Sequence, residues 1–193
     1  MLLRAISLFI IIATNVYSDE IPIITITAPS KKPQSISTVG SSVTIIDEKF
    51  LSNSTEHFLG DVLNTSSTSA NFFQSGGHGT ASAIQLRGMP KRYSTVYIDG
   101  VKMSDPSSVS GDFDFNNILT SQVSRVEILK GNQSSIYGSG AIGGTIHIFT
   151  KQGKSGFSKD VQYVTGSHNT HNLSASLSGG NDSSKYYLGL QRF

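Results

Sequence analysis

Three segments near the C-terminus alternate between apolar and polar residues, at positions 161–167, 172–178 and 185–193. In the middle segment, leucine and alanine share one face of an extended chain, and serine occupies the other face. Strands of about 10 residues with one apolar and one polar face are typical of a β-barrel that spans a membrane. Because a closed barrel needs about eight strands, we expect an N-terminal fragment of a larger protein.

Shorter patterns upstream predict a small mixed β-sheet. Asp99-Gly100 separates two of its strands and is a strong signal for a hairpin turn. Residues 152–160 are polar and glycine-containing, and we interpret them as a linker to the C-terminal segments. The strands are expected at residues 42–46, 83–88, 94–98, 101–103, 125–131 and 145–150.

One helix is expected after Asn53, which can cap it, with Glu56 as its partner in a capping box. Two polar, glycine-containing stretches at 64–80 and 104–117 are predicted loops, and the first carries an exposed aromatic pair at 72–73. Together with the strands, this pattern predicts an α+β domain with short helices. Four apolar residues at helical spacing are expected in its core, namely Phe58, Leu59, Val62 and Leu63.

The N-terminus has the parts of a secretory signal peptide. A short basic start is followed by an apolar run at 5–13 and by small residues near Ser18. The run is shorter than the roughly 20 apolar residues that span a bilayer. We expect a signal peptide at 1–18, with an N-terminal anchor as the alternative.

Residues 19–35 form an extended arm, because three prolines, at 22, 29 and 33, prevent a helix. Its middle, residues 23–27, has high β-propensity and no neighbouring strand in the sequence. Such a stretch favours strand addition to the sheet of another protein. An ordinary first strand of this domain is the alternative.

Composition excludes some functions. The formal net charge is +2 and no basic stripe is present, which argues against nucleic acid as a partner. The chain has no cysteine, so disulfides do not stabilise it, and 37% hydrophobic residues allow only a modest core. Its stability must come from that core or from a surrounding partner.

The glycine cluster at 138–143 spells G-x-G-x-x-G. A dinucleotide-binding loop of this form must be followed by a helix, but residues 145–150 alternate as a strand. We therefore interpret the glycines as permitting a tight turn and close backbone packing. Asp112 and Asp114 begin a pattern that fails as a calcium loop, and no catalytic arrangement of serine, histidine and aspartate emerges. We expect neither an enzyme nor a metal site, and no cofactor.

Three stretches occur in a distinctive order: LRG at 86–88, TVYIDGV at 95–101 and VSRVEILKGNQSSIYGSGAIGGTIHIFTK at 123–151. This succession resembles the plug domain of TonB-dependent outer-membrane receptors, and the likeness runs from about residue 22 to the C-terminus. The C-terminal segments are similar to the opening strands of the barrel that encloses the plug in this family. The resemblance implies an energised uptake receptor for a large, scarce nutrient.

The resemblance also implies an organisation and a location. It implies a signal peptide at 1–18, an arm at 19–35, a plug domain at 36–152 and the first transmembrane strands at 157–193. The plug would lie in the lumen of an outer-membrane barrel, with the N-terminus in the periplasm. The partner would be TonB with its inner-membrane energising complex. The arm residues at the position of the family's TonB box are Pro22, Ile23, Ile24, Thr25, Ile26 and Thr27.

Three charged residues lie on or beside expected plug strands, namely Arg87, Arg125 and Glu127. Similar charges in the family bridge the plug and the barrel wall, so we expect the same role here. The alternative is a set of local ion pairs, which contribute about 0–1 kcal/mol each at a surface.

The plug's outward loops would contact a ligand. The loop spacing looks most similar to the cobalamin receptor branch, in which Phe72, Phe73 and Gln74 can contact a large corrinoid. A ferric-siderophore receptor is the alternative, because Lys91, Arg92 and Tyr93 can meet an anionic chelate. The remaining candidate ligand contacts are Ser75, Asp105, Ser108, Val109 and Ser110.

A hypothesis from another class is a free-standing periplasmic module that binds or signals. The amphipathic segments between residues 161 and 193 argue against it, because they would expose apolar surface to water.

Overall fold

The computed structural model of the protein describes residues 25–27, 32–67, 69–77, 79–115, 117–167, 170–181 and 183–192. The expected signal peptide and the arm residues Pro22 to Ile24 lie outside these residues.

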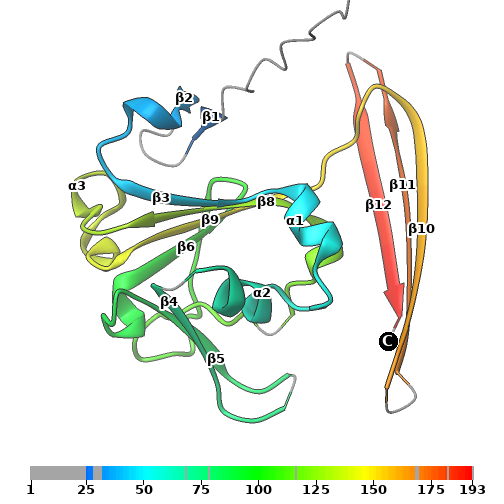
Figure 1. Ribbon diagram of the computed structural model, residues 1–193. Coiled ribbons are helices and arrows are strands. Elements are labelled where there is room, and N and C mark those ends of the chain that lie inside the picture. The colour runs from blue at the N-terminus through cyan, green and yellow to red at the C-terminus, as the bar shows by residue number, and fades with distance from the viewer. Residues whose placement is uncertain are drawn as a thin grey trace, which may run out of the picture.

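A five-stranded mixed sheet forms the centre of the domain (Figure 1). The strands lie in the order β3-β8-β9-β6-β7, and every neighbouring pair is antiparallel except β6 and β9. The mixed sheet and its Asp99-Gly100 hairpin are confirmed, although individual ends shift by a residue or two. The strand bounds are β3 Ser42–Ile46, β6 Ser94–Ile98, β7 Val101–Met103, β8 Val123–Lys130 and β9 Gly144–Thr150.

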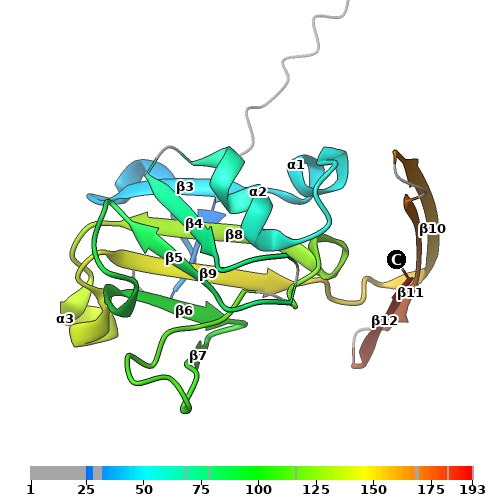
Figure 2. The same cartoon turned by 90° about the horizontal axis from the view of Figure 1, so that it is seen from below.

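One face of this sheet is covered by a helix and a hairpin, as Figure 2 shows from below, and a second helix, α1, lies at one end of the sheet. The helices are α1 Glu48–Asn53 and α2 Leu59–Ser66, and the hairpin pairs β4 Ala70–Gln74 with β5 Ser82–Leu86. The core lies between these layers, because alternate sheet residues point into it. Its largest fully buried side chains include Phe115, Leu59, Leu63, Leu86, Ile128, Ile146 and Ile148.

The start of the helical region differs from the sequence prediction. Asn53 does not cap a helix but ends α1, which is capped by Asp47, whose carboxylate accepts a 2.8 Å hydrogen bond from the Phe50 N–H. A separate helix, α2, begins at Leu59. The Ile118 carbonyl accepts the Leu59 N–H at 2.9 Å, so backbone from another segment replaces a side-chain cap. Among the described residues, no helix is long and apolar enough to cross a membrane.

The predicted loop at 64–80 is wrong in its middle, where β4 forms. Ala70 is buried and Phe72 packs against the core, while the residue between them faces outward. This alternation suits a strand half covered by α2, and the polar residues around it concealed the pattern. The predicted loop at 104–117 is confirmed over its described residues, which contain neither helix nor strand.

The glycine cluster makes a turn and not a nucleotide-binding loop. It follows the short helix α3 Ser134–Tyr137 and leads through a 3-10 turn at Ser139–Ala141 directly into β9. Gly144 has φ +148, and a Cβ there would overlap the Leu129 carbonyl oxygen and lie 2.8 Å from Leu86 Cδ1. The predicted close backbone packing is therefore confirmed.

Three long antiparallel strands follow, β10 Gly156–Gly166, β11 Thr170–Gly180 and β12 Lys185–Arg192. We call them the wall strands. The first begins inside the predicted linker, because residues 156–160 pair with β11. They stand beside the central sheet in both views (Figures 1 and 2). Their exposed apolar side chains are Phe157, Val161, Tyr163, Leu173, Leu177, Tyr186, Leu188 and Leu190.

A short hairpin lies on the other side of the sheet from α2 (Figure 1). It consists of β1 Thr25–Ile26 and β2 Gln34–Ser35, which pair antiparallel. A 3-10 turn at Ile36–Thr38 connects β2 towards β3.

Candidate binding surfaces

The predicted ligand loops are joined by an ion pair. Lys91 lies in a short 3-10 turn, and its ammonium group pairs with the carboxylate of Asp112 in the loop at 104–115. The Lys91 side chain is 51% exposed, whereas that of Asp112 is only 8% exposed. Because a nearly buried carboxylate needs a counter-charge, this pair commits much of the Lys91 charge within the protein.

The loop at 104–115 is anchored at its C-terminal end. Ser82 on β5 donates a 2.6 Å hydrogen bond to Asp114 and accepts one of 2.9 Å from the Phe115 N–H. The ring of Phe115 is buried in the core and makes an edge-to-face contact with Phe113. The rest of the loop leads to a fully exposed tip at Val109. A fixed base therefore carries an accessible tip.

Asp105 stabilises the turn that begins this loop. The N–H and hydroxyl of Ser107 both donate to its carboxylate, at 2.8 and 2.6 Å. These hydrogen bonds, first from the Ser107 hydroxyl and then from the backbone, lower the pKa of Asp105. The residue is therefore an anion at neutral pH, and Ser108 and Ser110 follow it in the same exposed turn region.

The aromatic pair of the β4 strand divides between two roles. Phe73 is 52% exposed, and Gln74 next to it donates to the Gly77 carbonyl at 2.8 Å. The prediction that both rings are exposed is wrong for Phe72, which packs on the core against Gly60 of α2. Adjacent residues of a strand face opposite sides, so only one ring of such a pair can point outward here. Ser75 continues this outward-facing end of the hairpin.

Arg92 and Tyr93 complete the predicted ligand surface. The Arg92 guanidinium lies 4.9 Å from the centre of the Tyr93 ring, a cation–π contact. The predicted ligand contacts lie in three loops, at 71–79, 89–93 and 104–115. In these loops two cations, Lys91 and Arg92, stand against three carboxylates, Asp105, Asp112 and Asp114.

Two of the three charged residues predicted to reach the barrel wall, Arg125 and Glu127, pair with each other within the plug. Arg125 Nε lies 2.9 Å from Glu127 Oε1, and its guanidinium lies 4.0 Å from the centre of the Phe149 ring. Glu127 is fully buried, whereas Arg87 is exposed in a turn at φ 55. The alternative of a local ion pair describes Arg125 and Glu127 in this structure. A contact of these charges with wall strands beyond β12 stays a prediction.

A chain of hydrogen bonds joins the plug to the wall strands, and the sequence did not indicate it. The Asn172 side-chain amide on β11 donates to Nδ1 of His57 at 2.9 Å, and its oxygen accepts from Gln191 of β12 at 3.1 Å. Gln191 in turn accepts a hydrogen bond from the Ser121 hydroxyl of the plug. We call His57, Asn172, Gln191 and Ser121 the polar clamp. The one available signal was the polar face of the wall strands, which points to these partners.

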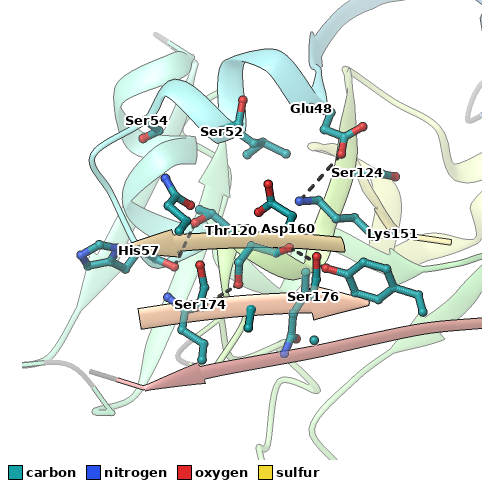
Figure 3. Close-up of a pocket in the computed structure, with 18 of the residues that line it drawn as sticks. Glu48, Ser52, Ser54, His57, Thr120, Ser124, Lys151, Asp160, Ser174 and Ser176 are labelled. Atoms are coloured by element: carbon teal, nitrogen blue, oxygen red, sulfur yellow. Dashed lines mark hydrogen bonds and ion pairs between the residues drawn. The ribbon is translucent and has the colours of Figure 1, made fainter. Parts of the chain in front are cut away.

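A cavity of about 870 Å³ lies beside the polar clamp, between α1 and the inner face of the wall strands. Figure 3 shows Glu48, Lys151 and Asp160 around it, together with the serines of β11 at positions 174 and 176. Lys151 Nζ lies 3.7 Å from Glu48 Oε1 across this space. A lining of hydroxyl, amide and paired charged groups is a surface that water or a polar molecule can wet.

The fold and these surfaces define a plug with the first strands of its wall. Residues 35–145 match the TonB-dependent receptor plug domain, which is more than half of the chain. The chain therefore belongs to this family, and the resemblance found in the sequence is confirmed.

Two proteins with stated functions are similar to this chain in sequence. It is 34% identical over 106 residues to the vitamin B12 transporter BtuB of Photobacterium profundum, which covers 55% of this chain and 17% of that protein. It is 26% identical to the ferric yersiniabactin uptake receptor FyuA from Yersinia pestis, with a TM-score of 0.62, over 79% of this chain and 24% of that one.

The fold extends to more distant structures. The ferripyoverdine receptor of the outer membrane of Pseudomonas aeruginosa is 18% identical and superposes with a TM-score of 0.73, over 86% of this chain and 22% of that one. That likeness confirms the predicted fold class, a plug domain followed by antiparallel wall strands. The chain spans about a quarter or less of the length of each of these relatives.

Proposed function

We propose that this chain is the plug-bearing part of an outer-membrane receptor that takes up cobalamin. The single observation that carries the ligand class is the similarity to a vitamin B12 transporter. The role is transport and not catalysis. The apolar outer face of the wall strands supports a position in the outer membrane, with the plug inside the lumen.

The charges of the ligand loops favour cobalamin over an anionic ferric chelate. Lys91 is already paired with Asp112, which leaves Arg92 as the cation of these loops beside the carboxylates of Asp105 and Asp114. A surface of this balance repels a strongly anionic chelate. A large corrinoid without a strong negative charge needs apolar contacts instead, and Phe73 and Val109 offer exposed apolar surface.

A ferric-siderophore receptor is the second candidate. Solved structures of that kind share this fold, and the FyuA likeness extends over 79% of the chain. Arg92 would then be the group that meets the chelate. The cobalamin proposal leaves Lys91 paired with Asp112, whereas an anionic chelate would bind better if Lys91 were released from that pair.

The partner proposed for the arm is TonB. Thr25 and Ile26 form the two-residue strand β1, which pairs with β2, and Thr27 follows them. The proposed organisation keeps a signal peptide at 1–18, the arm at 19–35, the plug at 36–152 and the transmembrane strands at 157–193. The N-terminus would then lie in the periplasm, where TonB reaches it.

A binding experiment separates these candidates. Outer membranes from cells that express the gene are titrated with cyanocobalamin and, separately, with a ferric catecholate. We expect saturable binding of cyanocobalamin only. Asp112→Asn, which frees Lys91, should raise affinity for the catecholate, whereas Asp105→Asn is the matched loss of one loop carboxylate without that pair.

Binding of the catecholate alone by the unmodified protein would replace the cobalamin proposal with the siderophore one. Recovery of the protein in the soluble periplasmic fraction, with neither ligand bound, would favour the free-standing module.

A further inference from the structure

The outer face of the wall strands carries two cations at different heights. Ser158, Asp160 and Ser174 line the cavity beside α1, so the alternate residues of each strand face away from the plug. The register is unbroken along both pairs of wall strands, so this alternation holds over their length. Among the outward-facing residues that the structure describes, Lys159 and Arg192 are the only lysine and arginine, and none is a carboxylate.

The two cations belong to opposite ends of an apolar band. At one end Phe157 and Tyr186 are exposed, and Tyr163 is exposed six residues after Phe157 along β10. Six residues of a strand span about 20 Å. Aromatic rings at both edges of an outward apolar band mark the headgroup levels where strands cross a membrane. Lys159 is two residues from Phe157, whereas Arg192 lies at the level of Tyr163.

Three polar side chains gather at the Tyr163 end of the band. In the strand register, Leu173 of β11 pairs with Tyr163 on one side and with Arg192 on the other. His171 is the next outward residue of β11, on a diagonal of about 7–8 Å from Arg192. The Tyr163 hydroxyl and Nδ1 of His171 share a 2.7 Å hydrogen bond, and their rings stack with centroids 6.1 Å apart. We call Tyr163, His171 and Arg192 the outer triad.

The outer triad combines a cation with hydrogen-bonding rings beside apolar surface. No ion pair joins Arg192 to another residue in the described ranges. A guanidinium on a lipid-facing strand is costly in the hydrocarbon region and tolerated near the interface, where phosphate oxygens match its planar donors. A phenol and an imidazole can also hydrogen bond to phosphate. An amphiphile with a phosphorylated head and apolar chains therefore suits both parts of this surface.

We propose that the outer triad binds a phosphate group of lipid A, the phosphorylated glycolipid of the outer leaflet, with acyl chains along Leu173 and Leu190. The inference rests on the proposed function, which places the wall strands in the outer membrane and the arm in the periplasm. Figure 1 shows β1 and β2 at the top, and the end of β12 at the bottom with the turn end of the β4–β5 hairpin. The end of β12 that carries the outer triad thus points to the outer leaflet.

Lys159 provides a matched comparison on the same face. It is an exposed cation at the other end of the apolar band, and its register partner is Leu177. Its outward neighbours along β10 are Phe157 and Val161, so no hydrogen-bonding ring lies next to it on that strand. Undirected attraction of anionic lipid would depend on either cation, whereas a built site depends on Arg192.

Native mass spectrometry of the whole protein in detergent tests the proposal. The protein is titrated with bis-phosphorylated lipid A, with fully dephosphorylated lipid A and with phosphatidylglycerol. We expect the first lipid to bind at least ~10-fold more tightly than the other two, and Arg192→Gln to remove that preference. Tyr163→Phe keeps the ring and should lose part of the preference. Lys159→Gln should change each affinity by less than ~2-fold.

Two results would overturn the site. The first is equal affinity of the unmodified protein for bis-phosphorylated lipid A and for either other lipid. The second is an equal loss in Arg192→Gln and Lys159→Gln, which would show undirected charge attraction. Arg192→Lys keeps the charge without the planar donors and should retain an intermediate preference. If Arg192→Gln fails to fold, full preference in both Arg192→Lys and Tyr163→Phe overturns the site as well.

The same preparations report separately on the proposed function, through membrane fractionation and cyanocobalamin binding. An outer-membrane protein that binds cyanocobalamin but does not distinguish the lipids keeps its function and loses only the lipid site. Preference for phosphorylated lipid A without cyanocobalamin binding supports the lipid site and overturns the proposed ligand. Recovery in the soluble periplasmic fraction overturns both.

Discussion

The side-chain amide of Asn172, on the second wall strand, donates a 2.9 Å hydrogen bond to Nδ1 of His57 in the plug. The amide nitrogen of asparagine can only donate, so Nδ1 of His57 is the acceptor in this contact. Asn172 is only 4% exposed, and its oxygen is used by Gln191. The wall strands and the plug therefore meet at a partly buried polar joint.

Loss of this joint should destabilise the protein. His57→Ala leaves the buried Asn172 amide without that acceptor, and we expect a cost of about 1–3 kcal/mol in the free energy of unfolding. Urea denaturation followed by circular dichroism measures it. Ser176→Ala, which removes a hydroxyl from the same cavity, is the control and should change the midpoint little. Equal losses in both variants would show that the joint has no special contribution.

The two rings of β4 should separate stability from binding. Phe72→Ala removes a ring packed on the core, and we expect it to cost about 3 kcal/mol of stability. Phe73→Ala removes an exposed ring and should leave the denaturation midpoint near that of the unmodified protein while weakening cyanocobalamin binding. A normal affinity in a folded Phe73→Ala variant would remove this residue from the ligand surface.

Gly144 should tolerate no side chain. An added Cβ would overlap the Leu129 carbonyl oxygen and lie 2.8 Å from Leu86 Cδ1, and backbone is poorly able to yield. We expect Gly144→Ala to cost about 1–3 kcal/mol or more, measured by thermal denaturation. Gly138→Ala is the matched variant, since that position also has positive φ, at +86, but open space around its Cβ. The comparison isolates crowding from backbone strain, and a smaller loss at Gly144 would contradict it.

The plug should lose stability in strong alkali through Tyr137. Burial raises the pKa of Tyr137 to about 12, and the neighbouring Tyr97 and Glu127 act in the same direction. The folded state thus favours the neutral phenol, whereas an unfolded tyrosine ionises near pH 10. This contribution is present below about pH 10 and is lost as the pH rises towards about 12. Alkaline titration by phenolate absorbance, paired with circular dichroism, measures it.

Tyr137→Phe is the control for that titration. It removes the ionisable group but keeps the ring against Tyr97 and His147, so its loss of stability over the same range should be smaller. Tyr97, whose pKa is also raised by burial, keeps a residual loss in this variant. Superimposable curves for the two proteins would contradict the assignment.

Most strands of the sheet and the family could be predicted from the sequence, because the signals for both are local. The alternation of β11 and the turn at Asp99-Gly100 each depend on a few adjacent residues. The residues before β9 also identified a turn and not a nucleotide loop, because the strand that follows them is readable by itself.

The features that could not be predicted depend on contacts between residues far apart in the sequence. Asp47 caps α1, but α2 starts at Leu59 because the Ile118 carbonyl accepts its N–H. Phe72 and Phe73 look alike until α2 covers one side of β4. His57 has no local motif at all, and its meaning appears only when Asn172 is placed beside it. Side-chain contacts between segments far apart in the chain leave no periodic trace in one sequence.

The order of strands in the central sheet has a consequence for biogenesis. Its middle strands, β8 and β9, are made after β3, β6 and β7, which flank them. Until β8 has been synthesised, the flanking strands lack their partners in the middle of the sheet. Pairing between strands that are far apart in the sequence is slow. The last residues of β9 are followed within a few positions by the first wall strand. The central sheet can therefore complete its pairing only when synthesis reaches the first wall strand, so the nascent plug cannot finish folding before then.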